Sequence, residues 1–225
     1  MAVALTDHIR LYHILHPDLK QFNQYEYKNT KRIKFSSGGQ YFCSVDHKNI
    51  HIFSTYTLER VRNLQIAPNT LSTISFNFND SRIVFVSADG LMQSFDLEEF
   101  SRIGELRNDR SYAYKNAIFL SHNDQSNNQV IVVGTKKDES ASLRLFDGDD
   151  MKECMAFRDE LENGPALCFT DVVKVVSPEQ LLENLVIGTN RGSVIVHGMP
   201  PRFLREDPQY RYGETMTHMG EITSL

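Results

Sequence analysis

IHIFS at residues 50–54 is the segment that decides the fold, because four similar segments occur elsewhere in the chain. They are IRLYH at 9–13, MQSFD at 92–96, LRLFD at 143–147 and VIVHG at 194–198. Each alternates apolar residues with polar or small ones, which is typical of β-strands. The next-to-last position is aromatic in four segments, at Tyr12, Phe53, Phe95 and Phe146, and is His197 in the fifth.

The spacing of these segments predicts a repeat protein. Tyr12 and Phe53 are 41 residues apart, Phe53 and Phe95 are 42 apart, and the two later steps are 51 each. A period of roughly 40–45 residues is that of a four-stranded β-propeller blade. The longer steps require insertions, for which 122–128 and 177–184 are the candidates. We therefore predict an all-β propeller with about four complete four-stranded blades and two partial ones.

The predicted organisation is part of one β-propeller across residues 1–225. We place a partial blade at 1–28, complete blades at about 29–68, 69–110, 111–159 and 160–216, and the start of a next blade at 217–225. Hairpin turns are expected at 37–40 and at Asp89-Gly90, because glycine tolerates the positive φ of tight turns. ALCFTDVVKVV at 166–176 is expected to be one strand, and KKDESA at 136–141 a lengthened turn.

Some of these residues resemble the elements of WD-repeat propellers, giving a WD40-type fold. Phe-Asp closes the third-strand segments at 95–96 and 146–147, where that family has Trp-Asp, and THMGEITSL at 217–225 is similar to its opening element. In the family a His, a Ser or Thr, a turn Asp and the Trp form a structural hydrogen-bond tetrad. This chain has no Trp. The resemblance leaves Asp46, Asp89 and His218 as tetrad-like positions in degenerate repeats.

A closer resemblance runs along most of the chain. The segments at 3–15, 35–59, 79–97, 185–200 and 218–225 resemble the second propeller of a family of cilia- and flagella-associated WD-repeat proteins. That family has two tandem propellers followed by a long coiled coil. The resemblance implies a non-catalytic axonemal scaffold on the doublet microtubule that helps to place inner-arm dyneins. Its implied partners are inner-arm dynein subunits, doublet-microtubule-associated proteins and tubulin.

Two alternatives stay open from the sequence. A propeller fold does not specify function, so a general cytoplasmic adaptor in trafficking or ubiquitin-ligase assembly is the competing hypothesis. The chain is expected to be a fragment of a longer protein, since its ends fall inside predicted blades. Alternatively, ITSL at 222–225 pairs with VALT at 3–6 and closes a five-bladed ring.

The predicted protein-interaction residues lie in MPPRFLREDPQYRYGE at 199–214. Basic and aromatic side chains are enriched at interface hot spots. The candidates are Arg202, Phe203, Arg205, Tyr210, Arg211 and Tyr212. The competing interpretation is a blade-edge connection followed by an outer strand.

No catalytic, cofactor or metal site is predicted. The sequence lacks phosphate-binding glycine motifs, its histidines lack zinc-ligand spacing, and DGDDMKE at 147–153 departs from the calcium-loop pattern. Three cysteines without CxxC spacing indicate free, mostly buried thiols in a reducing compartment.

Charge and hydropathy also limit the partners. The formal net charge is −5, which disfavours nucleic acid, and no apolar run is long enough for a membrane span. Lys28, Lys31, Arg32 and Lys34 form a local basic group. We interpret this group as a solvated turn and strand edge, because charge runs usually serve only to solvate.

Overall fold

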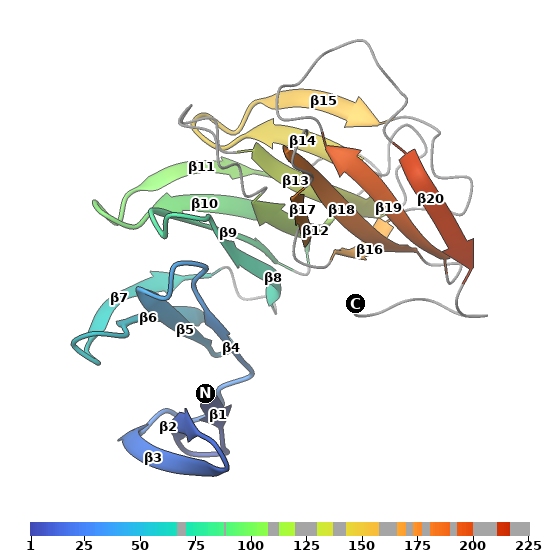
Figure 1. Cartoon of the computed structure of the whole chain (residues 1–225). Helices are drawn as coiled ribbons and strands as arrows, with labels where there is room; N and C mark the ends of the chain where they lie inside the picture. Colours follow the sequence, from blue (N-terminus) through green and yellow to red (C-terminus); the bar gives the residue numbers. More distant parts are fainter. Residues whose placement is uncertain are drawn as a thin grey trace. The chain divides into compact units, whose positions relative to one another are not determined.

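The chain is built from β-strands joined by turns (Figure 1). The computed structural model describes residues 1–66, 71–87, 89–107, 113–119, 130–136, 143–157, 166–169, 173–176, 181–189, 193–199 and 211–216. Within these ranges there are twenty strands in five antiparallel sheets, and no helix. Accordingly, these ranges hold no helix that could cross a membrane. The chain divides into two compact units, Met1–Leu71 and Ser72–Leu225, which are described in turn.

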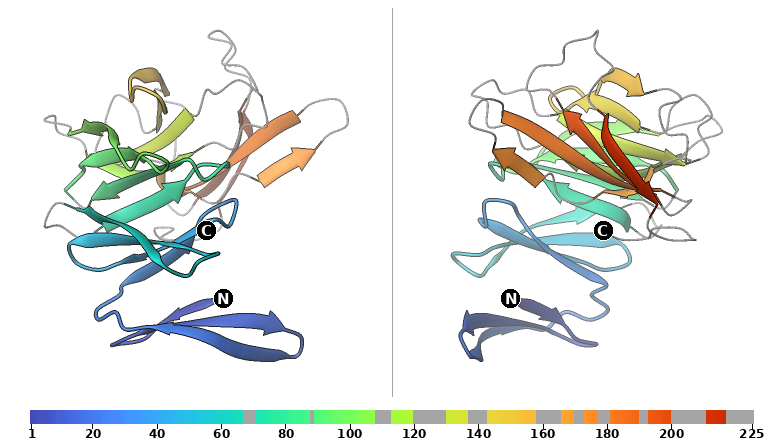
Figure 2. Two further views of the ribbon diagram at one scale, coloured as in Figure 1. Left: turned by 90° about the vertical axis from the view of Figure 1, so that its left-hand side faces the viewer. Right: turned by 45° about the vertical axis from the view of Figure 1, so that its right-hand side comes forward.

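The first unit holds two sheets, drawn in blue and cyan in Figure 2. A three-stranded sheet has the order β1 (Ala2–Ala4), β2 (Ile9–Leu15), β3 (Asp18–Tyr25). A four-stranded sheet has the order β4 (Arg32–Phe35), β5 (Tyr41–Val45), β6 (Asn49–Ser54), β7 (Arg60–Gln65). Each strand pairs with the next one in sequence, so short turns suffice to build both sheets. The turn after β4 uses Gly39 at φ +77°, as its glycine predicts.

Aromatic side chains hold these two sheets together. Phe42 of β5 and Phe53 of β6 are cross-strand partners whose rings stack at 4.7 Å between centroids. Both are fully buried, in one cluster with Ile9 and Leu11 of β2. Tyr25 of β3 packs its ring 5.0 Å from Phe53 and donates a 2.6 Å hydrogen bond to the Leu58 carbonyl. The period-two pattern of these strands thus places large apolar residues on the face that the neighbouring sheet covers.

The second unit repeats this plan. One sheet has the order β8 (Leu71–Phe76), β9 (Arg82–Ser87), β10 (Met92–Asp96), β11 (Arg102–Leu106). The next has the order β12 (Ala113–Phe119), β13 (Val130–Lys136), β14 (Leu143–Asp147), β15 (Glu153–Phe157). The last has the order β16 (Ala166–Phe169), β18 (Leu181–Thr189), β19 (Ser193–Met199), β20 (Arg211–Met216), with β17 (Val173–Val176) also paired to β18.

The interface between sheet β8–β11 and sheet β12–β15 is apolar in the middle. Its buried side chains come from β9, β10, β12, β14 and the turn after β14, namely Val84, Val86, Met92, Tyr114, Ala117, Phe119, Phe146 and Met151. A β-carbon added at Gly104 of β11 would lie 2.8 Å from the Met151 sulfur, so a glycine lets that turn approach. Each sheet therefore covers the face of its neighbour, as stacked repeats require.

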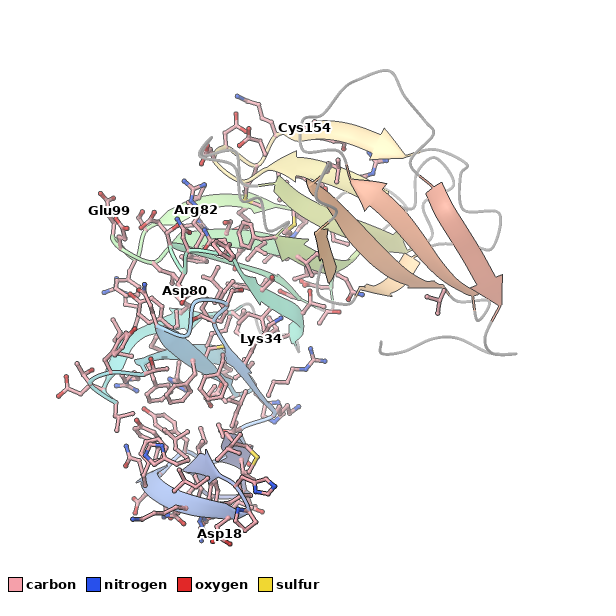
Figure 3. The ribbon with its side chains drawn as sticks, in the orientation of Figure 1. Asp18, Lys34, Asp80, Arg82, Glu99 and Cys154 are labelled. Atoms are coloured by element: carbon pink, nitrogen blue, oxygen red, sulfur yellow. The ribbon has the colours of Figure 1, made fainter. Side chains whose placement is uncertain are left out.

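Polar contacts support the same interface at its edges. The Ala117 amide of β12 donates to the Thr73 hydroxyl of β8 at 3.1 Å. Arg82, labelled in Figure 3, reaches from the start of β9 to the turn after β14. Its Nη1 donates to the Gly148 carbonyl at 2.5 Å and pairs with the Asp149 carboxylate at 2.5 Å. The acidic stretch at 147–153 is thus a turn between third and fourth strands, and its carboxylates face an arginine and backbone amides.

The structure confirms the predicted all-β fold of consecutive four-stranded antiparallel sheets. The Asp89-Gly90 turn is confirmed as well, with Gly90 at φ +83°. The proposed insertion at 122–128 lies outside the described residues.

ALCFTDVVKVV at 166–176 was predicted as one strand. Its parts 166–169 (β16) and 173–176 (β17) both pair with the nine-residue β18, and residues 170–172 lie outside the described part of the chain, so this prediction stays untested. Two details of the prediction were wrong. Leu181–Asn184, predicted as part of an insertion, is the half of β18 that pairs with β17. Lys136, predicted in a loop, ends β13 opposite Ala113.

Candidate functional site

Two of the six predicted interaction residues, Arg211 and Tyr212, fall at the outer edge of the last sheet. Arg211 and Tyr212 begin β20, which is the edge strand in the order β16-β18-β19-β20. Arg211 is the partner of His197, and the register shifts next to it between Val196 and His197. The backbone therefore has the outer strand that the competing interpretation expected. Arg202, Phe203, Arg205 and Tyr210 lie outside the described residues, so the proposed hot spot stays a prediction.

The first tetrad-like residue, Asp46, organises the turn between β5 and β6. Its Oδ1 accepts hydrogen bonds from the backbone amides of Lys48 at 2.6 Å and Asn49 at 2.7 Å. The Asn49 side-chain amide lies within 3.3 Å of both carboxylate oxygens. His51 Nε2 lies 3.1 Å from Oδ2. Burial alone raises the pKa of Asp46, but these donors outweigh it and hold the pKa below its ordinary value of 3.8.

His51 links this turn to the interior of the sheet. It lies opposite Ser44 on β5, and the Ser44 hydroxyl is hydrogen-bonded to Thr30 at 3.0 Å. The ring of Tyr27 packs 4.9 Å from the His51 ring. His51 Nδ1 is buried without a hydrogen-bond partner among the described residues. Serine, histidine and aspartate thus meet here, but the histidine comes from β6 of the same sheet rather than from an opening Gly-His element.

The second tetrad-like residue, Asp89, forms fewer and longer hydrogen bonds than Asp46. Its Oδ1 accepts one hydrogen bond, from the Leu91 amide at 3.4 Å, and its Oδ2 lies 3.4 Å from Arg107, an exposed partner. The buried hydroxyl of Ser87 has no partner among the described residues. Asp89 thus occupies the predicted turn without building a polar network. His218, the third tetrad-like residue, lies outside the described part of the chain.

The remaining reactive groups show no catalytic grouping in the described part of the chain. No three His, Cys, Asp or Glu side chains there are placed to share a metal ion. His8 pairs with Asp7, and His13 stacks on Phe22 at 4.0 Å. Burial raises the pKa of the Cys43 thiol to about 12, so it stays protonated and unreactive. Cys154 is exposed and the side chain of Cys168 is not described, so the expectation of mostly buried thiols stays a prediction.

Comparisons with solved structures define the class of protein. The "beta-propeller domain" of Myceliophteria_thermophila Cps50 (Swd1) is similar over 89% of this chain and 61% of its own, with a TM-score of 0.62 and 16% identity. The RRP9 WD40 repeats match 88% of this chain and 56% of theirs, with a TM-score of 0.63 and 17% identity. The fold is therefore that of a WD-repeat β-propeller. The WD40 domain of SCAP from fission yeast is similar as well, over 91% of this chain and 45% of its own, with a TM-score of 0.56 and 15% identity.

Comparisons with curated proteins point to a particular relative. The chain resembles "Cilia- and flagella-associated protein 57" of Mus musculus, with 30% identity over 102 residues. It also resembles "Cilia- and flagella-associated protein 57 A" of Tetrahymena thermophila, with 34% identity over 91 residues. These matches cover 45% and 40% of this chain but only 8% and 7% of the relatives' lengths. No protein-family model matches the chain.

Proposed function

We propose that this chain is a non-catalytic propeller module of the cilium or flagellum that binds protein partners in the axoneme. The observation that carries the proposal is the pair of relatives named as cilia- and flagella-associated, found in an animal and in a ciliate. A propeller supplies rigid sheets with turns at both ends of each blade, and loops on rigid scaffolds are common binding sites. The described residues form a packed and mostly hydrogen-bonded frame of this kind.

The second part of the proposal concerns the place of the module in the axoneme and its partners. We propose that it acts on the doublet microtubule and helps to place inner-arm dyneins, with dynein subunits, microtubule-associated proteins or tubulin as partners. The six candidate residues between Arg202 and Tyr212 remain the proposed contact residues. The proposed repeat units remain the blades at about 29–68, 69–110, 111–159 and 160–216.

The proposal is tested by fractionation of cilia that express the full-length protein with an epitope tag at its own locus. After detergent removes the membrane, the protein is expected to stay with the axonemes through a wash in moderate salt. A freely soluble adaptor would instead leave with the detergent extract, as would a cytosolic marker followed on the same blot. Release of the bulk of the protein with that marker would overturn the axonemal role.

A further inference from the structure

Basic side chains gather at one end of sheet β4–β7. The connection from β3 to β4 and the turn from β5 to β6 meet there, since the Lys31 amide donates to the Val45 carbonyl at 2.8 Å. The other side of that turn is fixed by the Ile66 amide, which donates to the Lys48 carbonyl at 2.8 Å. We call this end, with Lys28, Lys31, Arg32 and Lys48, the basic end. The structure thus adds Lys48 to a group that the sequence shows only as 28, 31, 32 and 34.

The carboxylate of Asp46, at the basic end, is not paired with these lysines. Asp46 lies in the same turn, but its oxygens accept hydrogen bonds from the Lys48 amide, from Asn49 and from His51. The side chains of Lys28, Lys31 and Lys48 are exposed. None of their ammonium groups forms an ion pair with a carboxylate of the described residues. The basic end therefore presents three exposed ammonium groups, those of Lys28, Lys31 and Lys48, without an ion pair to a carboxylate of the described residues, while Asp46 is already hydrogen-bonded within its own turn.

The charge is also uneven along the chain. Residues 1–71 contain nine Lys and Arg against five Asp and Glu, a formal charge of +4. Residues 72–225 contain the other fifteen and twenty-four, a formal charge of −9. The formal net charge of the whole chain is −5, which disfavours a nucleic acid, whereas a short acidic segment needs only the local surplus of the first unit. The charges thus favour an acidic peptide over a nucleic acid.

We propose that the basic end binds an acidic segment of a partner protein, meaning a short run of Asp and Glu residues. Lysine suits this role because its ammonium is a point charge on a flexible stem, with three donors that can follow carboxylates in varied positions. This inference specifies the kind of partner that the proposed scaffold binds, and it rests on that proposed function. Binding by the purified chain tests it separately from location in the cell.

The test measures binding of a fluorescent peptide of eight glutamates to the whole 225-residue chain by anisotropy. The test variant is Lys28→Gln/Lys31→Gln/Lys48→Gln. The matched control is Lys20→Gln/Arg62→Gln/Lys152→Gln, which removes the same charge from exposed cations elsewhere. Circular dichroism and the thermal midpoint verify that both variants are folded.

We expect the original chain to bind the peptide and to bind it more weakly as salt rises, since exposed charge pairs are screened. The test variant should lose roughly tenfold in affinity, from three exposed charge contacts, and the control less than about threefold. Three outcomes would overturn the proposal: no binding by the original chain, equal losses in the two variants, or tighter binding of an eight-nucleotide RNA than of the peptide. Failure here would leave the axonemal fractionation result standing.

Discussion

Two turns at equivalent places, Asp46 after β5 and Asp89 after β9, show how the same residue does different work in neighbouring repeats. Asp46 accepts from two backbone amides, the Asn49 side chain and His51, while Asp89 accepts from one amide at 3.4 Å. Gly90 closes the second turn with a positive φ. The first turn has no glycine and is held by the aspartate. An Asp at this position therefore marks the turn, while the residues after it decide how strongly it is held.

The largest expected effect is a difference in stability between variants that lose the equivalent phenylalanine in each of the two sheets. Phe53 is 1% exposed and stacks on Phe42, whereas Phe95 is only partly buried against Phe85. Phe53→Ala should lower the free energy of unfolding by about 3–5 kcal/mol, the usual cost of emptying a buried aromatic site. Phe95→Ala should cost roughly half as much, because less apolar surface is lost. Urea unfolding followed by circular dichroism measures both, and equal losses would contradict the comparison.

The next effect concerns the two aspartates themselves. Asp46→Ala leaves buried or partly buried donors without an acceptor and should cost about 1–3 kcal/mol of unfolding free energy. Asp89→Ala removes one long hydrogen bond and one exposed ion pair and should cost at most about 1 kcal/mol. Thermal and urea midpoints of the two variants, recorded side by side, decide this. A larger loss for Asp89→Ala would show that the turn networks are assigned the wrong way round.

The same contrast predicts a dependence on pH. Hydrogen-bond donors hold the pKa of Asp46 below its ordinary value of 3.8 in the folded chain. A depressed folded-state pKa gives stability that is present above the unfolded-state pKa and is lost as pH falls through the folded-state pKa. The stability gap between the original chain and Asp46→Asn should thus be full at pH 6–7 and shrink steadily below about pH 4. A gap that stays constant down to about pH 2.5 would contradict the role given to Asp46.

The smallest effect compares two buried serines, Ser44 on β5 and Ser87 on β9. Ser44 is hydrogen-bonded to Thr30, so Ser44→Ala should cost about 1 kcal/mol of unfolding free energy. The buried Ser87 hydroxyl has no partner among the described residues, so Ser87→Ala should be neutral or slightly stabilising. The two melting temperatures, measured in one buffer, should therefore move apart. Similar destabilisation by both substitutions would mean that Ser87 has a partner of its own.

The sequence predicts the repeated strands well because each blade carries a local signal. The next-to-last aromatic in four of the five repeated segments and the glycines at 39 and 90 are signals that act within a few residues, so they can be recognised without knowing the neighbouring strands. β3 was missed, since Asp18–Tyr25 is largely polar and exposed and shows no clean alternation.

Pairing of side chains was harder to predict than turns. Asp46 was singled out by its place in a hairpin, but its bond to His51 depends on the cross-strand register of β5 and β6. The basic group was visible at 28–34, yet its meeting with Lys48 follows only from the hydrogen bonds that bring two loops to one end of a sheet. Local patterns thus give the blades, while the surfaces that bind partners are assembled from segments that are distant in sequence.

The most direct test of the central claim is cryo-electron tomography of axonemes from a ciliated cell that lacks this protein. The account predicts that averaged doublet microtubules lose density in the inner-arm region, together with a subset of inner dynein arms. Expression of the full-length protein should restore both. Doublets with a complete set of inner arms and no missing density, in cells shown to lack the protein, would contradict the account.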